Sequence, residues 1–527
     1  MDWQNERDEL FKRNALAEKL GGEDKIERQH KGGRLTVRER IDQILDVGTF
    51  REIGATAGSY NYDGDGNITS HTPSNCVMGR GRIDGRAVVV SGDDFTIRGG
   101  SADAAIKEKA IYPEKMANEL RLPIIRLIEG SGGGGSVKTI ETKGRANLPG
   151  GVGQSSGFNL LAENMATVPV VGLGLGSVAG LGAAHLAASH YSVLVKDIGA
   201  MFVAGPPVVK HIGEDLDKQE LGGHAIQTAA GGVDHAAESE ADAFECTRRF
   251  LSYLPSSVHA APPILHPNPD DPVDRREEEL FSLIPRSRTA TFDMRKAIRL
   301  LADRDSFFEI GSLWGTDQIT GFVRFDGHTL GVIASDSRHV NGGALTADGC
   351  DKLRRHIDLC DVFHIPILNL VDNPGFAVGL EHEIAGTIRK GGEWMVAFAQ
   401  IKVPIFTVIA RRSFGVAGNN YATPLARPSM RVAWPSADTG GIPPEGGIEA
   451  AYKRQLAEAE DPVALRAEIE ARIESARGPL GPLSRFQIEE MLDPADTRQF
   501  ICEWVKTAYR IVSQPDQLGP RALQFRP

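Results

Sequence analysis

The stretch Val-Pro-Val-Val-Gly-Leu-Gly-Leu-Gly-Ser-Val-Ala-Gly-Leu-Gly-Ala-Ala, residues 168–184, decides the fold because its pattern returns about 235 residues later. Eleven positions separate Pro169 from Gly180, and eleven separate Pro404 from Gly415. In both copies an apolar strand leads through a small-residue turn into a helix. Such a turn leaves backbone N–H groups without helical partners, so they can hold a developing oxyanion. The repeat predicts two oxyanion holes.

Further phrases recur in the same order along the chain, which indicates an internal duplication. The offsets between the copies are 257, 242, 243 and 235, as expected if only the loops changed length. Within each half, short apolar strands alternate with helical stretches, which is typical of β-α repeats. The phrases that recur besides the opening stretch are 38–54 with 295–311, 82–85 with 324–327, and 123–132 with 366–375. We predict two diverged copies of one α/β domain.

Composition indicates a large two-domain enzyme. The chain has 527 residues, of which 41% are hydrophobic, and a net charge of −11 argues against non-specific nucleic-acid binding. Its five cysteines are widely spaced, and the N-terminus shows no basic and apolar signal, so we expect a cytoplasmic protein. Residues 164–195 carry no Lys, Arg, Asp or Glu, but their Gly and Ala content favours a buried strand, turn and helix over a membrane span.

The predicted domain order follows from these patterns and from a segment rich in proline and charge. We expect a helical arm over 1–30, an N-terminal domain over 31–255, an exposed linker over 256–292, a C-terminal domain over 293–515 and a tail over 516–527. Within the charged segment 445–477, residues 467–477 are expected to form a solvated helix.

Other motifs give weaker signals. Residues 130–136 follow a strand and contain five glycines, which fits either close backbone approach to a ligand or a flexible loop. The glycines from Gly174 to Gly180 are one residue too widely spaced for a dinucleotide fingerprint, and Gly153–Gly157 spells a nucleophile elbow without the strand that an elbow needs. The histidines are scattered, so we assign none to catalysis. The predicted catalytic groups are backbone amides.

The chain resembles the carboxyltransferase (beta) subunits of biotin-dependent acyl-CoA carboxylases, the group that contains propionyl-CoA and methylcrotonyl-CoA carboxylases. The similar phrases span residues 33 to 498 in family order. They include Gly-Arg-Leu-Thr-Val-Arg-Glu-Arg-Ile at 33–41, Asp-Phe-Thr-Ile-Arg-Gly-Gly-Ser at 94–101, Met-Phe-Val-Ala-Gly-Pro-Pro-Val-Val-Lys at 201–210, Asp-Asn-Pro-Gly-Phe at 372–376 and Asp-Pro-Ala-Asp-Thr-Arg at 493–498.

The resemblance implies two tandem crotonase-like domains of the ClpP/crotonase class, with acyl-CoA on the N-terminal domain and carboxybiotin on the C-terminal one of a partner protomer. It implies enolate chemistry without a metal, with CO2 passing from carboxybiotin to the α-carbon of a propionyl-like acyl-CoA. The implied partners are a biotinylated alpha subunit, which combines biotin carboxylase and carrier, and further beta subunits in a homo-hexamer. The implied site residues are Gly180, Leu181, Val416 and Ala417 as catalytic amides, Gly132, Gly133, Ala179, Gly182 and Asn419 around the substrate, and Gly375, Phe376 and Gly415 around biotin.

Some positions depart from the family pattern and leave alternatives open. The usual Gly-Gly of the first turn is Gly180-Leu181 here, and the usual Gly-Ala of the second is Val416-Ala417, so side chains narrow both turns. Asn419 stands where short-chain members tend to have Asp. The alternatives are a biotin-dependent carboxyacyl-CoA decarboxylase, which transfers the carboxyl group in the opposite direction, and a catalytically silent scaffold in a carboxylase complex.

Overall fold

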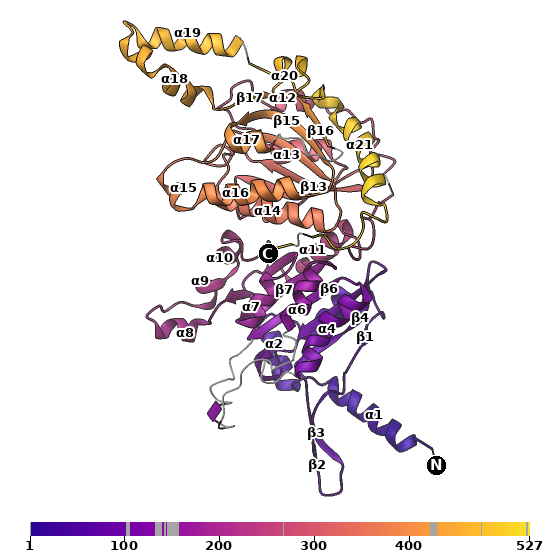
Figure 1. The fold of residues 1–527 in the computed structure, drawn as a ribbon. Coiled ribbons are helices and arrows are strands. Elements are labelled where there is room, and N and C mark those ends of the chain that lie inside the picture. The colour runs from indigo at the N-terminus through magenta and orange to yellow at the C-terminus, as the bar shows by residue number, and fades with distance from the viewer. Residues whose placement is uncertain are drawn as a thin grey trace. The chain divides into compact units, whose positions relative to one another are not determined.

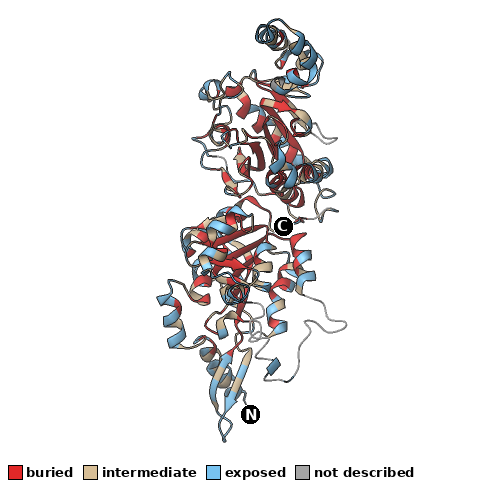
Figure 2. Cartoon of the chain, turned by 90° about the vertical axis from the view of Figure 1, so that its left-hand side faces the viewer, coloured by how far each residue is buried: buried red, intermediate tan, exposed pale blue. Residues whose placement is uncertain are grey.

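The computed structural model describes residues 2–101, 106–131, 140–141, 144, 157–266, 268–421, 429–475, 477–522 and 525–527. The chain divides into two compact units, Met1–Ala260 and Ala261–Arg526 (Figure 1). Both contain a central sheet of buried strands with exposed residues on the outer helices (Figure 2). Among the described residues, no helix combines the length and apolar character that crossing a bilayer requires.

The first unit is built on an eight-stranded sheet whose strand order is β1-β4-β5-β6-β7-β8-β10, with β9 paired to β7. The β1–β4 and β4–β5 pairs are antiparallel and the remaining pairs are parallel. A separate hairpin, β2 (Gly58–Tyr62) with β3 (Ile68–Pro73), projects beside α1 (Figure 1). The sheet strands are β1 (Arg51–Glu52), β4 (Cys76–Ile83), β5 (Arg86–Asp93), β6 (Ile124–Ser131), β7 (Val170–Ala179), β8 (Tyr191–Val195), β9 (Ala200–Phe202) and β10 (His235–Ala237).

The second unit repeats this topology strand for strand. Its order is β11-β12-β13-β14-β15-β16-β18, with β17 paired to β15. The strands are β11 (Phe308–Ile310), β12 (Gln318–Phe325), β13 (His328–Ser335), β14 (Ile367–Asn373), β15 (Ile405–Phe414), β16 (Met430–Ala433), β17 (Asp438–Gly440) and β18 (Glu490–Met491). The prediction of two tandem α/β domains of one crotonase-like type is confirmed.

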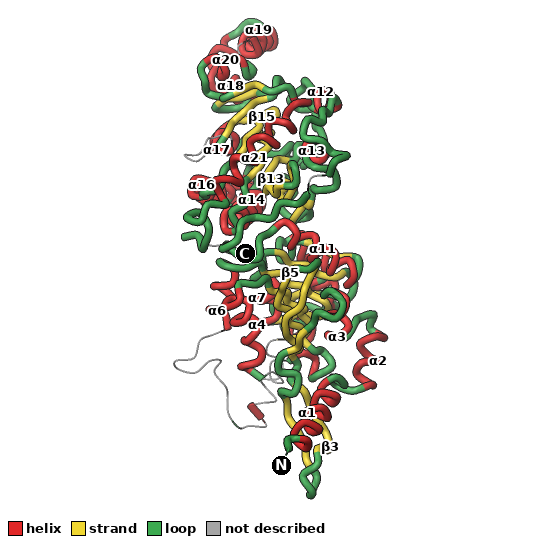
Figure 3. Tube along the Cα trace, turned by 90° about the vertical axis from the view of Figure 1, so that its right-hand side faces the viewer, coloured by secondary structure: helices red, strands yellow, loops and turns green. Residues whose placement is uncertain are grey.

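Helices cover both sheets (Figure 3). Those of the first unit are α1 (Gln4–Ala17), α2 (Glu23–Lys31), α3 (Val37–Ile44), α4 (Lys107–Leu120), α6 (Gly157–Met165), α7 (Leu181–Ala187), α8 (Pro206–His211), α9 (Lys218–Gly222), α10 (His224–Ala229) and α11 (Glu240–Tyr253), with a 3-10 turn η1 (Arg98–Gly100). Those of the second are α12 (Glu279–Leu283), α13 (Met294–Leu301), α14 (Ala347–Val362), α15 (Leu380–Ile384), α16 (Thr387–Gln400), α17 (Gly415–Tyr421), α18 (Pro444–Glu458), α19 (Pro462–Ser475), α20 (Leu480–Ser484) and α21 (Thr497–Val512), with η3 (Pro494–Asp496).

The duplicated phrases make the same local contacts in both units. In the first, the N–H groups of Asp84 and Gly85 donate to the Asp46 carboxylate at 3.0 and 2.8 Å. In the second, a carboxylate 257 positions later, Asp303, accepts from the N–H groups of residues 326 and 327 at 3.0 and 2.9 Å. Each pair ties the turn between two antiparallel strands to the loop after a helix. The same contact is thus kept although the offsets differ, 257 for the carboxylate and 242 for the turn, which supports duplication rather than chance similarity.

One expectation about the connecting segments differs from the structure. The proline-rich stretch is not an exposed linker beyond residue 260, because Leu280 and Phe292 are buried in the core of the second unit. Arg498 donates to the Asp271 and Pro272 carbonyls and so fixes the start of this stretch to α21. The charged segment 445–477 contains α18 and α19, and Asp461 caps α19 just before Pro462. The helix expected over 467–477 lies in α19 as far as Ser475.

Candidate functional site

The first glycine turn lies between β7 and α7. Gly180 has φ +60° and ψ −121°, a backbone conformation that a residue with a side chain rarely adopts. The N–H of Ala184 donates to the Gly180 carbonyl, so the amides of Leu181 and Gly182 precede the first helical hydrogen bond. The Leu181 side chain is 48% exposed. The turn thus presents amides at the end of a buried strand, with the leucine side chain outside the core.

The second glycine turn has the same construction between β15 and α17. Gly415 has φ +62°, within two degrees of Gly180. The offset of 235 makes Val416 equivalent to Leu181 and Ala417 equivalent to Gly182. Val416 is 60% exposed and Ala417 is buried. The Leu181 and Val416 side chains, which stand where the family pattern has glycine, are exposed, and each residue still carries a backbone N–H.

Glycines also line the approach to the first turn. A Cβ on Gly130, at the end of β6, would lie 2.7 Å from the Gly99 carbonyl oxygen, so β6 and η1 touch backbone to backbone. A Cβ on Gly182 would lie 3.4 Å from the Gly130 carbonyl oxygen. Ala179 pairs with residue 131 in the β6–β7 ladder. Three chain segments therefore meet at this turn. Gly132 and Gly133 lie outside the described residues.

The residues expected around biotin gather beside the second turn. The Gly375 carbonyl accepts from the Leu345 N–H at 2.9 Å, and a Cβ on Gly415 would lie 3.8 Å from the Gly375 Cα. Phe376 packs its ring so closely on Gly391 that a Cβ there would lie 2.4 Å from it. Asn419 is exposed on α17, two residues beyond Ala417. The structure thus brings together Gly375 and Gly415, with Phe376 next in the chain.

A buried carboxylate stands at the same strand position in each unit, and sequence reasoning gave it no role. Glu129 is fully buried on β6, where Arg34 and Arg40 donate to its two oxygens at 2.6 and 2.5 Å. Asp372, 243 positions later on β14, accepts two hydrogen bonds each from Arg411 and Arg412 at 2.7–3.0 Å. The pairing of these two acids within the duplicated phrases was the available signal.

The two carboxylates recruit their arginines from different segments. Arg411 is the counterpart of Gly176, and a Cβ on Gly176 would lie 2.5 Å from a Glu129 oxygen. The longer Glu129 fills the space that an arginine side chain occupies in the second unit. Burial opposes ionisation of Asp372, but the guanidinium groups of Arg412 and Arg411 hold its pKa below the usual value. Arg411 is buried, and both Arg411 and Arg412 pair with Asp372.

A cavity of about 150 Å³ opens behind the first turn within the first unit. Its described lining residues come from β4, β5, η1, α4, β6 and α7, and include Leu181 and Gly182. The volume suits the acyl part of a small thioester rather than a complete coenzyme A. Its charged lining residues are Asp93, Glu114 and Arg126.

The two histidines near the first turn have different surroundings. His190 is fully buried, where its Nδ1 accepts from the Val170 N–H at 3.0 Å and its Nε2 lies 2.9 Å from the Met165 carbonyl oxygen. His185, on α7, lines the cavity, and burial followed by the neighbouring Arg126 lowers its pKa to about 4. His185 is therefore neutral at physiological pH.

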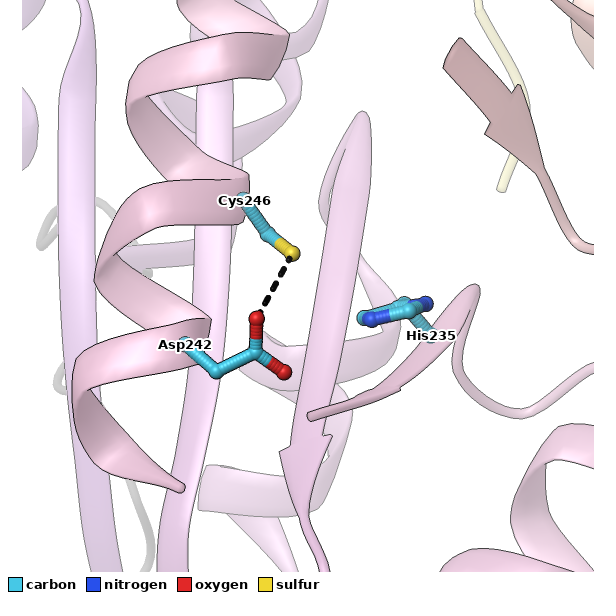
Figure 4. Close-up of side chains that lie close together, drawn as sticks. All are labelled: His235, Asp242 and Cys246. Carbon is cyan, nitrogen blue, oxygen red and sulfur yellow. Dashed lines mark hydrogen bonds between the residues drawn. The ribbon is translucent and has the colours of Figure 1, made fainter. Parts of the chain in front are cut away.

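One group of metal-type side chains occurs in the part of the chain that the structure describes. The ligand atoms of His235 on β10 and of Asp242 and Cys246 on α11 lie within 4.8 Å of one another (Figure 4). The Cys246 thiol donates to Asp242 at 3.9 Å, and burial raises its pKa to about 11. A metal would need to displace that proton. The group lies at the β10 edge of the sheet, beyond β8 from the strand that ends in the first turn.

Known proteins are similar to this chain over nearly its whole length. The family described as "Carboxyl transferase domain" matches residues 28–512. The carboxyltransferase subunit of propionyl-CoA carboxylase from Haloferax mediterranei is 34% identical over 525 residues, which cover 98% of this chain and 99% of that protein. The mitochondrial propionyl-CoA carboxylase beta chain of Homo sapiens is 32% identical over 515 residues, which cover 94% of this chain and 89% of that protein.

A solved structure of transcarboxylase 12S, a hexamer with methylmalonyl-coenzyme A and methylmalonic acid bound, matches with a TM-score of 0.84 and 27% identity. The match covers 100% of this chain and 99% of that chain. The resemblance drawn from the sequence is thereby confirmed. Since the family match spans most of the chain and relatives above 30% identity cover nearly all of it, this protein belongs to the carboxyl transferase domain family.

Proposed function

We propose that this chain is the carboxyltransferase subunit of a biotin-dependent acyl-CoA carboxylase that acts on a short acyl-CoA. The observation that carries the proposal is the pair of equivalent turns, in which a buried strand ends at a glycine with φ near +60° and a helix follows. Carboxyl transfer from carboxybiotin to an acyl thioester places negative charge on two oxygens, and the chain has one turn for each.

The roles of the individual residues follow from the equivalence of the turns. The amides at Gly180 and Leu181 would hold the acyl thioester oxygen while the α-carbon loses its proton, and Gly182 would contact the substrate beside them. The amides at Val416 and Ala417 would hold the ureido oxygen of the partner's biotin. One well-placed donor of this kind contributes about 2.7–4 kcal/mol to the transition state. Backbone amides can supply this stabilisation without a side-chain base.

The remaining substrate and biotin contacts are assigned by position. Ala179 borders the first turn, and Asn419 follows the second on an exposed face of α17. Gly375 and Phe376 lie on the loop that meets Gly415. Gly132 and Gly133 are retained as acyl-CoA contacts on the strength of the family resemblance.

The acyl group, the cofactor and the assembly are proposed from the relatives. Propionyl-CoA is the reference substrate because the two relatives named above are propionyl-CoA carboxylase subunits. Biotin would arrive on a carrier of a separate alpha subunit, as a curated relative named a biotin-dependent carboxylase beta subunit suggests. We propose a homo-hexamer by analogy with transcarboxylase 12S. We further propose that this half-reaction uses no metal and that the protein acts in the cytoplasm.

A mass-spectrometric assay tests this function without the alpha subunit. The purified chain is incubated with a panel of carboxyacyl-CoAs, beginning with methylmalonyl-CoA, with and without free biotin. Decarboxylated acyl-CoA that forms only in the presence of biotin would establish carboxyl transfer and identify the acyl group. No product across the panel would favour the scaffold. The decarboxylase alternative shares this half-reaction and would be favoured if carboxyacyl-CoA is consumed but acyl-CoA is never carboxylated by the reconstituted holoenzyme.

A further inference from the structure

Three side chains of metal-binding type come together in the first unit, away from its glycine turn (Figure 4). His235 lies on β10, and Asp242 and Cys246 lie one turn apart on α11. Their ligand atoms all lie within 4.8 Å of one another, and the Cys246 Sγ is 3.9 Å from the Asp242 carboxylate. The ligand atoms of a tetrahedral zinc site lie about 3.3–3.5 Å apart, so each pair has to close by about 1.5 Å or less.

The helix α11 already orients two of these three groups. Ser239 caps the start of the helix by accepting from the Asp242 N–H at 3.1 Å. The Asp242 Oδ2 accepts from the Glu238 N–H at 2.9 Å, which leaves Oδ1 beside the Cys246 thiol. Outer hydrogen bonds of this kind usually hold a carboxylate that binds a metal. One oxygen and one sulfur are thus presented on the same face of the helix.

The third group comes from a different element of the fold. β10 pairs in parallel with β8, which places His235 beside Val193 at the edge of the sheet. Within the described residues, the His235 ring makes no hydrogen bond. A ring nitrogen of His235 therefore lies near the oxygen and the sulfur without being held by another partner.

The surrounding charges and the types of ligand atom favour a zinc ion. The charged groups that act most strongly on His235 and Cys246 are three acids and two bases, namely Asp234, Glu238 and Asp242 with Lys196 and Arg249. The group therefore has a negative charge even before the thiol loses its proton. Sulfur, nitrogen and carboxylate oxygen together suit Zn²⁺, whereas Mg²⁺ and Ca²⁺ prefer oxygen ligands alone.

We propose that His235, Asp242 and Cys246 bind one zinc ion, with water in the fourth position, and that the ion ties α11 to the β10 edge of the first sheet. The thiol proton passes to solvent as the zinc–sulfur bond forms. β8 lies between β10 and the strand that ends in the glycine turn, so the site is separate from that turn. Zinc at this position stabilises the first unit and takes no part in carboxyl transfer.

Cobalt substitution in the full chain tests this site. The protein is freed of metal with a chelator, kept reduced, and titrated with Co²⁺ while absorption spectra are recorded. We expect one Co²⁺ per chain, the intense visible bands of a tetrahedral site, a cobalt–thiolate band in the near ultraviolet, and displacement by Zn²⁺. Loss of an outer-shell partner typically weakens metal binding about 10–100-fold, so loss of a ligand in Cys246→Ala or His235→Ala should weaken Zn²⁺ binding more than about 100-fold.

The matched control removes another cysteine that lies beside a histidine. The Cys360 Sγ lies 3.6 Å from the His356 Nε2 in the second unit, but no third ligand completes a group there among the described residues. Cys360→Ala should keep the cobalt spectrum and the affinity for Zn²⁺. Zn²⁺ at about 100 times its dissociation constant should raise the thermal unfolding midpoint of the wild type and of Cys360→Ala by about 5 °C, but not that of Cys246→Ala.

Several results would overturn the proposal. They are no binding of Co²⁺, a spectrum without a thiolate band, a band that persists in Cys246→Ala, and a band that is lost in Cys360→Ala. Alanine is a good helix former, so Cys246→Ala should keep α11 folded, which circular dichroism checks. If Cys246→Ala does not fold, His235→Ala leaves the sequence of α11 unchanged, and an unaltered affinity for Zn²⁺ in that variant would equally overturn the proposal.

Discussion

Replacing Gly180 with proline should abolish carboxyl transfer while the protein remains folded. Proline fixes φ near −65°, and Gly180 has φ +60°, so the backbone would rotate by about 125° at the residue that aims the turn. The amides of Leu181 and Gly182 would leave their present directions. Since one lost oxyanion donor lowers kcat about 10²–10³-fold, we expect at least that loss in biotin-dependent decarboxylation.

The matched control is Gly213→Pro in the same unit. Gly213 also has a positive φ, +102°, and its N–H donates to the Lys210 carbonyl at 3.1 Å, but it lies in an exposed loop after α8. Both variants lose one N–H and one left-handed glycine, so their thermal unfolding should shift alike. Only Gly180→Pro should lose turnover. If Gly180→Pro unfolds like the control and keeps turnover within about tenfold of the wild type, the first oxyanion hole lies elsewhere.

Three further predictions address the turn side chains, the buried ion pairs and the pH dependence. Leu181→Ala and Val416→Ala keep the backbone N–H and shorten an exposed side chain, so turnover in the same assay should change less than about threefold. A loss of about 10²-fold or more would mean that these side chains take part in catalysis. Glu129→Gln leaves Arg34 and Arg40 without a full counter-charge and should lower the free energy of unfolding by about 3–5 kcal/mol in urea denaturation. The control, Glu9→Gln on exposed α1, should lower it by less than about 1 kcal/mol. Similar losses in both variants would contradict a stabilising role for the buried Glu129 ion pairs. Burial raises the pKa of Asp93 from 3.8 to about 7, so the folded state keeps a proton that the unfolded chain loses, and stability falls as pH rises from about 4 to 7. Asp93→Asn should remove this pH dependence, so its free energy of unfolding should rise relative to that of the wild type between about pH 4 and 7. Urea unfolding at a series of pH values measures both. If the two proteins show the same pH dependence, Asp93 ionises normally.

The fold could be predicted from the sequence because the duplicated segments include residues that contact one another within each unit. The Asp-Gly turn at 84–85 and its copy at 326–327 use the same aspartate cap, so their spacing in the sequence reflects a packing constraint. The glycine turns could also be predicted, since a positive φ at the end of a strand almost requires glycine. Long apolar strands such as β7 and β15 are typical of a parallel sheet buried on both faces.

The cavity and the buried ion pairs could not be predicted in this way. Arg126 reads as one charge within an apolar strand, and its role depends on the carbonyl groups of a helix about 60 residues later. Arg40 reaches Glu129 across 89 residues. No local pattern encodes such distances, because they follow from where the strands and helices are placed. The same holds for the proline-rich stretch, whose composition predicts exposure but whose Leu280 lies in the core.

The contrast between Glu129 and Asp372 suggests how the two units diverged without losing the turn. Each acid stands on the strand beside the one that ends in the glycine turn, and each is neutralised by two arginines. In the second unit those arginines come from β15, the strand that carries the turn. In the first unit, Gly176 has no side chain at the equivalent position of β7, and the arginines that pair with Glu129 are Arg34 and Arg40 instead. An arginine at Gly176 would collide with Glu129, so the acid and its partners must have changed together. The requirement that persisted is a neutralised buried carboxylate, which fixes the strand from which each turn is presented.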